Sequence, residues 1–216
     1  MSSPSRAGRV LVLIGIPLLA VNLRPAAISV GPVLDEIRAA LDMSAAEAGV
    51  LTSLPVIAFA VFGALAPRLS ALVGPHRLTV VSLACVVGGV LGRSQAGSTL
   101  LFLGLSLLAL TGMAIANVLL PSLVKQHFPD HIGRMTAVYS TALALGLTSA
   151  SVLTVPVSEA AGGADGWRSG LAVWSLTAVL ALVPWLLLWR QDRDRHTSGA
   201  SRRVTLGVVA RTRLGR

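Results

Sequence analysis

One apolar segment near the N-terminus carries side chains that could bind a polar or charged solute. In the stretch AVNLRPAAISVGP, residues 20–32, Asn22 and Arg24 stand just before Pro25. A guanidinium recognises anions, and an amide offers both a donor and an acceptor. Proline removes a backbone hydrogen bond and clashes with the carbonyl four residues earlier. The stretch therefore combines polar side chains with irregular backbone.

The charge of Arg24 is expensive in its surroundings. A helix that begins at Val10 places Arg24 about 21 Å into a hydrocarbon core of about 30 Å. A central arginine costs about 2.5–3.5 kcal/mol, and each neighbouring leucine, isoleucine or valine returns about 0.3–0.6 kcal/mol. Two interpretations are open: the guanidinium snorkels to the outer interface, or it faces water or a ligand in a cavity. The break expected at Pro25 favours the cavity.

Helical geometry limits how Asn22 and Arg24 can act together. They lie about 200° apart on a regular helix, so both cannot point into one cavity. Either the kink at Pro25 rotates the outer half of the segment, or one of the two side chains pairs with a neighbouring helix.

Polar side chains also occur in other apolar runs. Thr52 stands three residues before Pro55, and Asn117 is the residue whose carbonyl Pro121 leaves unpaired. Small residues form a stripe with Tyr139, made of Ala142, Gly146 and Ser149, and such stripes pack helices more often than they bind ligands. Asn117 and Tyr139 are bulky enough to reach a ligand. The substrate-binding residues that we expect are Asn22, Arg24, Thr52, Asn117 and Tyr139.

The composition is that of a membrane protein. The chain has 216 residues, of which 54% are hydrophobic and 12% are charged, and its mean hydropathy is +0.76. Soluble domains carry about 25% charged residues. The charges are therefore too few to cover a water-exposed surface, and we predict an all-α polytopic membrane protein.

Six apolar runs are long enough, or nearly so, to cross a bilayer. They cover residues 10–30, 49–69, 78–91, 100–124, 132–157 and 167–189. The third is short, and we expect Arg77 and Arg93 to flank it. Trp167 and Trp189 are roughly 33 Å apart along the sixth helix, which predicts one tryptophan at each interface. The first run also resembles a signal peptide, but the five later spans favour a first anchor.

The basic residues predict the orientation. Fourteen of the eighteen lysines and arginines fall on the side of the two termini, and three fall in the opposite loops. Loops rich in lysine and arginine stay inside the cell, so we expect a multi-pass protein of the cell (inner) membrane with both termini cytoplasmic. Residues 1–9 would form a cytoplasmic N-terminus, residues 10–189 a six-helix bundle, and residues 190–216 a basic, disordered cytoplasmic tail.

Several function classes find no support in the sequence. The formal charge of +9 arises from residues that flank apolar runs, so we expect no nucleic-acid partner. Neither a phosphate-binding GxxxxGK[ST] loop nor an HExxH motif occurs, and the one cysteine, Cys85, excludes an intramolecular disulfide. We predict no enzymatic activity, cofactor or metal. The histidines are expected to be solvated in loops or the tail: His76, His127, His131 and His196.

Three stretches of the chain resemble the cyanate/nitroimidazole transporter family of the major facilitator superfamily. They are residues 22–41, 48–69 and 112–146, and the most specific matches are N-x-R-P at residues 22–25 and NVLLPSLVK at residues 117–125. The resemblance implies half of a major-facilitator-type bundle, whose first, second, fourth and fifth helices line a cavity. It implies a proton-linked or passive secondary carrier for a small polar or anionic solute, resembling cyanate or a nitroimidazole.

The resemblance also implies a cytoplasmic gate loop between the second and third helices. The segment GALAPRLSALVGPHR, residues 63–77, is similar to it in degenerate form. The residues that fit are Gly63, Arg68, Gly74 and Arg77. Pro67 stands where an aspartate is usual, which puts the charge relay of that gate in doubt.

A carrier of this superfamily has two six-helix halves around a central site, and this sequence supplies one. We expect its partners to be a small-molecule substrate, the lipid bilayer, and a second half or a second copy. The tail reads either as an ordinary linker between halves or as a frameshifted or prematurely ended continuation. The alternative functions are a truncated, non-transporting half-carrier and a partner-binding membrane protein.

Overall fold

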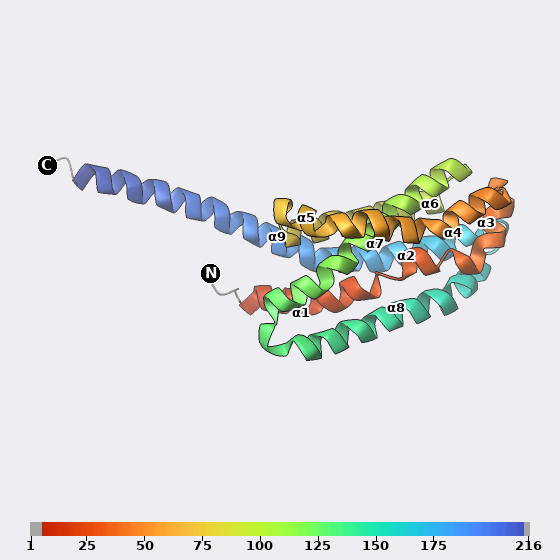
Figure 1. The fold of residues 1–216 in the computed structure, drawn as a ribbon, viewed down its shortest axis with the longest axis horizontal. Helices are drawn as coiled ribbons and strands as arrows, with labels where there is room; N and C mark the ends of the chain where they lie inside the picture. Colours follow the sequence, from red (N-terminus) through yellow and green to blue (C-terminus); the bar gives the residue numbers. More distant parts are fainter. Residues whose placement is uncertain (1–5, 214–216) are drawn as a thin grey trace.

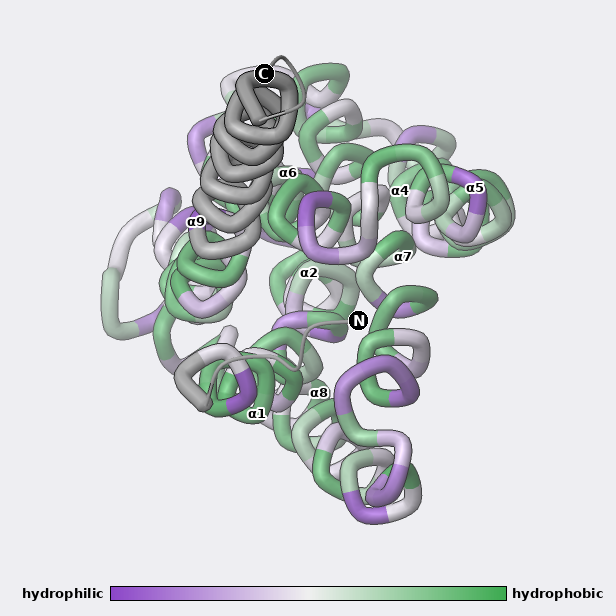
Figure 2. Tube along the Cα trace, turned by 90° about the vertical axis from the view of Figure 1, so that its left-hand side faces the viewer, coloured by the Kyte–Doolittle hydropathy of each residue, from purple (hydrophilic) through white to green (hydrophobic). Residues whose placement is uncertain are grey.

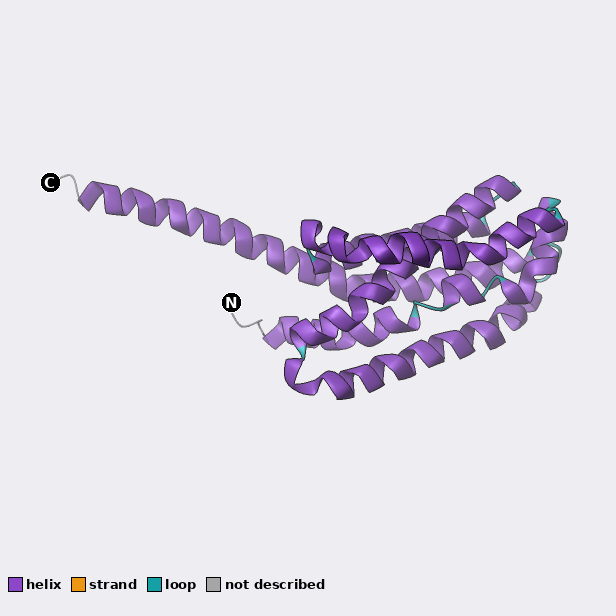
Figure 3. Cartoon of the chain, in the orientation of Figure 1, coloured by secondary structure: helices purple, strands orange, loops and turns teal. Residues whose placement is uncertain are grey.

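The protein is a bundle of helices that run roughly side by side, as Figures 1 and 3 show. The structure, a computed structural model, describes residues 6–213, with side chains for residues 8–190, and contains no strand in that range. The helices are α1 (Arg6–Val21), α2 (Pro25–Ile28), η1 (Gly31–Val33), α3 (Leu34–Leu41), α4 (Ala45–Ala58), η2 (Phe59–Gly63), α5 (Ala64–Val73), α6 (Pro75–Ser94), α7 (Thr99–His127), η3 (Pro129–His131), α8 (Ile132–Ala161) and α9 (Gly166–Arg213).

Among the described residues, six helical stretches are long and apolar enough to cross a membrane. They are Gly8–Leu41, Ala45–Val73, Pro75–Ser94, Thr99–His127, Pro129–Ala161 and Gly166–Arg190. Each contains one of the six predicted runs, so the predicted all-α fold with six transmembrane helices is confirmed. Figure 2 shows the predominantly apolar bundle from its end.

Local sequence signals set the short turns between the spans. Ser44 accepts a hydrogen bond from the backbone N–H of Glu47, whose carboxylate accepts one from the N–H of Ser44, which starts α4 with a capping box. Gly74 joins α5 to α6 with a φ of 88°, a backbone conformation that favours glycine. These turns alternate between the two ends of the bundle, so successive spans are antiparallel (Figure 1).

The spans pack through small residues. Helix α6 lies along α7 and α9, and α1 lies against α8 and α9. A Cβ atom on Gly112 of α7 would collide with the carbonyl oxygen of Ser82 in α6. Such close backbone approach is how transmembrane helices gain van der Waals contact without a hydrophobic driving force.

Two residues expected at the membrane boundaries lie inside the protein. Arg93 does not flank the third span but belongs to the last turn of α6, and its side chain is 0% exposed. Trp167 is 1% exposed and meets Phe102 edge-on, with ring centroids 6.0 Å apart. Both predictions used sequence position alone, whereas neighbouring helices cover the outer ends of α6 and α9.

The segment expected to be a gate loop is mostly helical. Gly63 ends the π-helical stretch η2, Arg68 is exposed in α5, and Arg77 is exposed in the first turn of α6. Only Gly74 lies between helices. Residues 63–69 belong to the second predicted span, and the structure continues that span as helix to Val73, with Pro67 inside α5.

Two of the histidines expected to be solvated face each other instead. His76 at the start of α6 and His127 at the end of α7 are half-buried, with their Nε2 atoms 3.1 Å apart. The antiparallel packing of α6 and α7 brings these two helix ends together. For the basic tail, α9 continues as a helix to Arg213, but the side chains after Arg190 lie outside the described residues.

Candidate functional site

The first span is broken where the sequence predicts it. Helix α1 ends at Val21, residues 22–24 form a turn, and Pro25 starts the four-residue helix α2. Pro25 lacks the N–H that would continue the α1 ladder, while its fixed φ suits the first position of a new helix. Carbonyl oxygens next to the break therefore lack helical hydrogen bonds, and other groups must donate to them.

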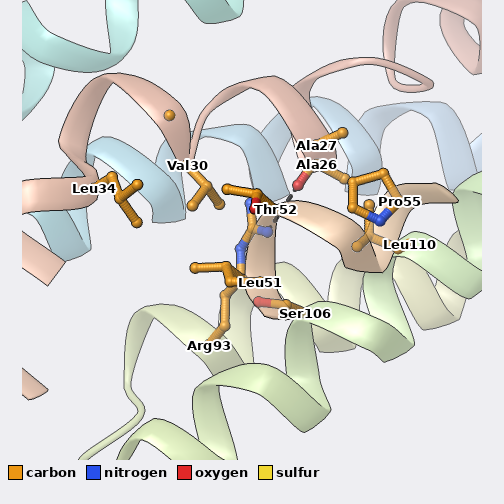
Figure 4. A pocket seen from close by; sticks show the side chains of 11 residues that line it. Ala26, Ala27, Val30, Leu34, Leu51, Thr52, Pro55, Arg93, Ser106 and Leu110 are labelled. Carbon is orange, nitrogen blue, oxygen red and sulfur yellow. Dashed lines mark hydrogen bonds between the residues drawn. The ribbon is translucent and has the colours of Figure 1, made fainter. Parts of the chain in front are cut away.

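A cavity of about 170 Å³ lies beside this break. Its walls come from the segment that follows the break, from α4, and from α6 and α7 (Figure 4). Most of the lining is apolar, and the polar side chains in it are Thr52, Arg93 and Ser106. The hydroxyl of Thr52 donates to the carbonyl of Gly49 in its own helix. Of the predicted binding residues, Thr52 is the one that lines this cavity.

Arg93 supplies the charge of the cavity. Its Nη1 donates to the carbonyl oxygen of Ala26 at 2.7 Å, and its Nη2 donates to the hydroxyl of Ser29 at 3.0 Å. Both acceptors belong to the segment after the break, so the guanidinium of α6 holds the outer part of the first span. The sequence analysis missed this role because Arg93 stands at the end of an apolar run, where arginine usually marks a loop.

Asn22 is used for packing. Its 3% exposed side chain donates to the carbonyl oxygens of Leu18 and Thr177 at 2.8 and 2.9 Å. The hydroxyl of Thr177 donates back to the Asn22 Oδ1 at 2.8 Å. Of the two interpretations left open, the one in which Asn22 pairs with a neighbouring helix, here α9, describes the structure.

Arg24, in contrast to Asn22, points away from the interior of the bundle. It is exposed, it stands directly before α2 as its N-cap residue, and it is not part of the cavity wall. Among the residues with described side chains, the buried cation is thus Arg93, and the charge of Arg24 is left on an exposed face of the bundle. Asn22 and Arg24 point in different directions, as their spacing of about 200° on a regular helix predicts.

The remaining predicted residues lie elsewhere. Asn117 and Tyr139 are half-buried in α7 and α8, outside the lining of this cavity. The stripe that contains Tyr139 packs helices: Ala142 and Gly146 are buried, and a Cβ atom on Gly146 would collide with the carbonyl oxygen of Val21. Helix α8 therefore lies against the first span just before its break.

The exposed surface of α8 contains two sectors, and Leu147 and Leu153 are exposed outside both of them. Small or hydroxyl-bearing side chains recur every three or four residues: Ala137, Ser140, Thr141, Ala144, Thr148 and Ser151, all exposed. We call these six residues the small-residue sector of α8. Beside it stand Val138, Leu145 and Val152, seven residues apart and also exposed. By contrast, the exposed side chains of α9 between residues 170 and 189 are Leu176, Val179, Leu180, Val183 and Leu187.

Six antiparallel helical stretches that are long and apolar enough to cross a membrane define a multi-pass integral membrane protein. The chain belongs to the Major Facilitator Superfamily, whose family model matches residues 18–215. The predicted resemblance is thereby confirmed.

Three transporters from bacteria are similar in sequence. The "Uncharacterized transporter YycB" of Bacillus subtilis (strain 168) is 40% identical over 193 residues, covering 89% of this chain and 46% of that protein. The "2-nitroimidazole transporter" of Escherichia coli (strain K12) is 32% identical over 207 residues, covering 96% and 52%. The "Cyanate transport protein CynX" of the same strain is 32% identical over 176 residues, covering 82% and 44%. The chain spans about half the length of the curated relatives it matches.

Solved structures support the same fold. The proton:xylose symporter XylE bound to 6-bromo-6-deoxy-D-glucose matches with a TM-score of 0.70 at 17% identity, covering 87% of this chain and 45% of that chain. The inward open conformation of XylE from E. coli matches with a TM-score of 0.67 at 18% identity, covering 84% and 47%. At this identity the similarity shows the fold alone. The relatives are transporters rather than enzymes, in line with the predicted absence of enzymatic activity.

Proposed function

We propose that this chain forms one six-helix half of a secondary carrier that moves a small polar or anionic solute, of cyanate or nitroimidazole type, across the membrane. Similarity to a 2-nitroimidazole transporter and a cyanate transport protein supports the solute class. Family membership supports the carrier. A second half or a second copy of the chain completes the path, because six helices do not enclose a central site.

The observation that carries this proposal is the exposure of Arg24 at the break of the first span. A hydroxyl in a membrane helix can bond to its own backbone, as Thr52 does, but a guanidinium cannot be satisfied in that way. An arginine facing lipid at this depth carries a penalty of about 2.5–3.5 kcal/mol. Water or solute between two halves removes that penalty, so the open face at Arg24 becomes the substrate path.

The small-residue sector of α8 supports a covering partner. Alanine, serine and threonine at helical spacing let a second helix approach closely. The valine and leucine residues beside this sector, like those on α9, suit lipid. We therefore place the second half against α8 and the open face of the first span.

Within this carrier Arg24, Thr52, Asn117 and Tyr139 face or border the substrate path, and Asn22 holds the break in place through α9. Gly63, Arg68, Gly74 and Arg77 form the cytoplasmic gate segment. The excess of basic residues near the termini supports a cytoplasmic position for both ends and the inner membrane for the bundle.

Uptake into vesicles tests the proposal. The purified 216-residue chain is reconstituted, and entry of radiolabelled cyanate and 2-nitroimidazole is followed with Arg24→Ala and Arg134→Ala variants. We expect saturable uptake of at least one solute, a loss of about tenfold or more in Arg24→Ala because a charge-assisted hydrogen bond is worth about 1.5–3 kcal/mol, and little change in Arg134→Ala. Arg134 is a matched control, since it is exposed in the first turn of α8. If neither solute enters the vesicles, transport by this chain is contradicted.

A second candidate function is a membrane protein that binds a partner and transports nothing. The small-residue sector of α8, which lets a second helix approach closely, favours it. Such a protein would insert and associate through α8 but show no uptake in the same vesicles.

A further inference from the structure

We propose that the cavity at Arg93 is a binding site for a small monovalent anion. This site is distinct from the open face at Arg24, and it lies within one six-helix unit instead of between two. The inference therefore does not depend on whether the chain transports a solute.

The first observation is an uncompensated buried charge. The Arg93 side chain is 0% exposed, and no carboxylate pairs with it among the described residues. The two bonds to Ala26 and Ser29 use two of the five N–H groups of a guanidinium, and the Nε–H has no partner. A buried charge without a counter-charge is strongly destabilising, so a group that supplies the opposite charge will bind with a favourable free energy.

The second observation is independent of the first. The hydroxyl of Ser106 in α7 lines the same cavity, is 0% exposed and has no hydrogen-bond partner. Serine in a helix usually bonds to the carbonyl four residues earlier, and Ser106 does not. A buried hydroxyl left unpaired costs about 1–3 kcal/mol. Two unpartnered donors therefore lie in the wall of one cavity, the Arg93 Nε–H and the Ser106 O–H.

The size and lining of the cavity restrict the ligand. A cavity of about 170 Å³ has room for a small planar anion together with some water. Its mostly apolar lining offers few partners to an anion that carries many hydroxyl groups. Apolar neighbours such as Val30, Leu51 and Leu110 lower the local dielectric constant and strengthen the attraction to the guanidinium. Figure 4 shows Arg93 and Ser106 among these residues.

An anion at this site would also act on the first span. The Nη1 and Nη2 atoms of Arg93 bind the Ala26 carbonyl and the Ser29 hydroxyl, so the same guanidinium contacts the anion and the segment after the break. Occupancy then stabilises the outer part of the first span against α6.

Calorimetric titration of the detergent-purified chain with sodium nitrate tests the site. Sodium gluconate holds the ionic strength constant and serves as a larger, hydroxylated anion that the mostly apolar lining does not suit. We expect saturable nitrate binding in the wild-type chain, no saturable binding in Arg93→Met, and about tenfold weaker binding in Arg93→Lys, which keeps the charge but loses the planar fork. Ser106→Ala should weaken binding by about three- to tenfold through the loss of one hydrogen bond. Arg134→Met should match the wild type.

The variants separate binding from folding. If Arg93→Met does not fold, Ser106→Ala and Arg93→Lys still decide the question. Ser106→Ala keeps a small side chain of similar volume, and Arg93→Lys keeps a long, positively charged one. Unchanged nitrate affinity in both overturns the proposal, as does equal heat from nitrate and gluconate or the absence of saturation in the wild type. Nitrate binding without solute uptake leaves this site standing and contradicts the carrier function alone.

Discussion

At the scale of single residues, the asparagine of the N-x-R-P motif stabilises the break by a paired side-chain contact with α9. Asn22 and Thr177 exchange two hydrogen bonds: the Asn22 amide donates to the Thr177 carbonyl oxygen, and the Thr177 hydroxyl donates to the Asn22 Oδ1. We expect Asn22→Ala and Thr177→Val each to lower the stability of the bundle. Their effects should couple by about 0.6 kcal/mol, the average for polar pairs between membrane helices, and by no more than about 1.7 kcal/mol.

A double-mutant cycle on unfolding in mixed micelles measures this coupling. The control pair is Asn22→Ala with Ser53→Ala, because Ser53 bonds only to the Gly49 carbonyl of its own helix. Additive effects of Asn22→Ala and Thr177→Val would contradict the paired role of Asn22 and would favour the prediction that Asn22 binds substrate.

At the scale of the elements, the backbone of α8 packs directly against the backbone of the first span. Because a side chain at Gly146 would occupy the position of the Val21 carbonyl oxygen, Gly146→Val should force the helices apart. Overpacking of this kind costs about 1–3 kcal/mol or more. Thermal unfolding in detergent measures the loss, with Gly104→Ala as the control, since a Cβ at Gly104 of α7 meets nothing within 4 Å. Equal stability of the two variants would refute the close packing.

The helical elements could be predicted from the sequence, but the contacts between them could not. Long apolar runs predict spans because insertion depends on local hydropathy, and proline predicts a break because its effect is local as well. The burial of Arg93 depends on the carbonyl of Ala26, which is 67 residues away in the chain. The facing of His76 and His127 likewise arises only when α6 and α7 pack. In the structure Gly89 and Gly112 permit the close packing of these two helices. The polar groups that this packing brings together could not be identified from the sequence alone.

At the scale of the whole molecule, the two sectors of α8 indicate which surface a second six-helix unit covers. Ala144 belongs to the small-residue sector and Leu145 to the apolar one, and both are exposed. Consecutive residues on a helix point about 100° apart at almost the same depth. A spin label at each position, in a Cys85→Ala background, therefore compares two directions at one level of the membrane.

In vesicles that contain the chain alone, we expect a label at Ala144→Cys to be shielded from dissolved oxygen relative to one at Leu145→Cys. Oxygen concentrates among acyl chains, so a surface covered by a second copy, or one that faces water, relaxes the label more slowly than a surface in lipid does. Diluting the protein into excess lipid should raise the oxygen accessibility at Ala144 and leave that at Leu145 unchanged, because dilution separates the copies. Equal accessibility at both positions under all dilutions would mean that α8 faces lipid on both sectors, and the second unit would then have to cover another face of the bundle.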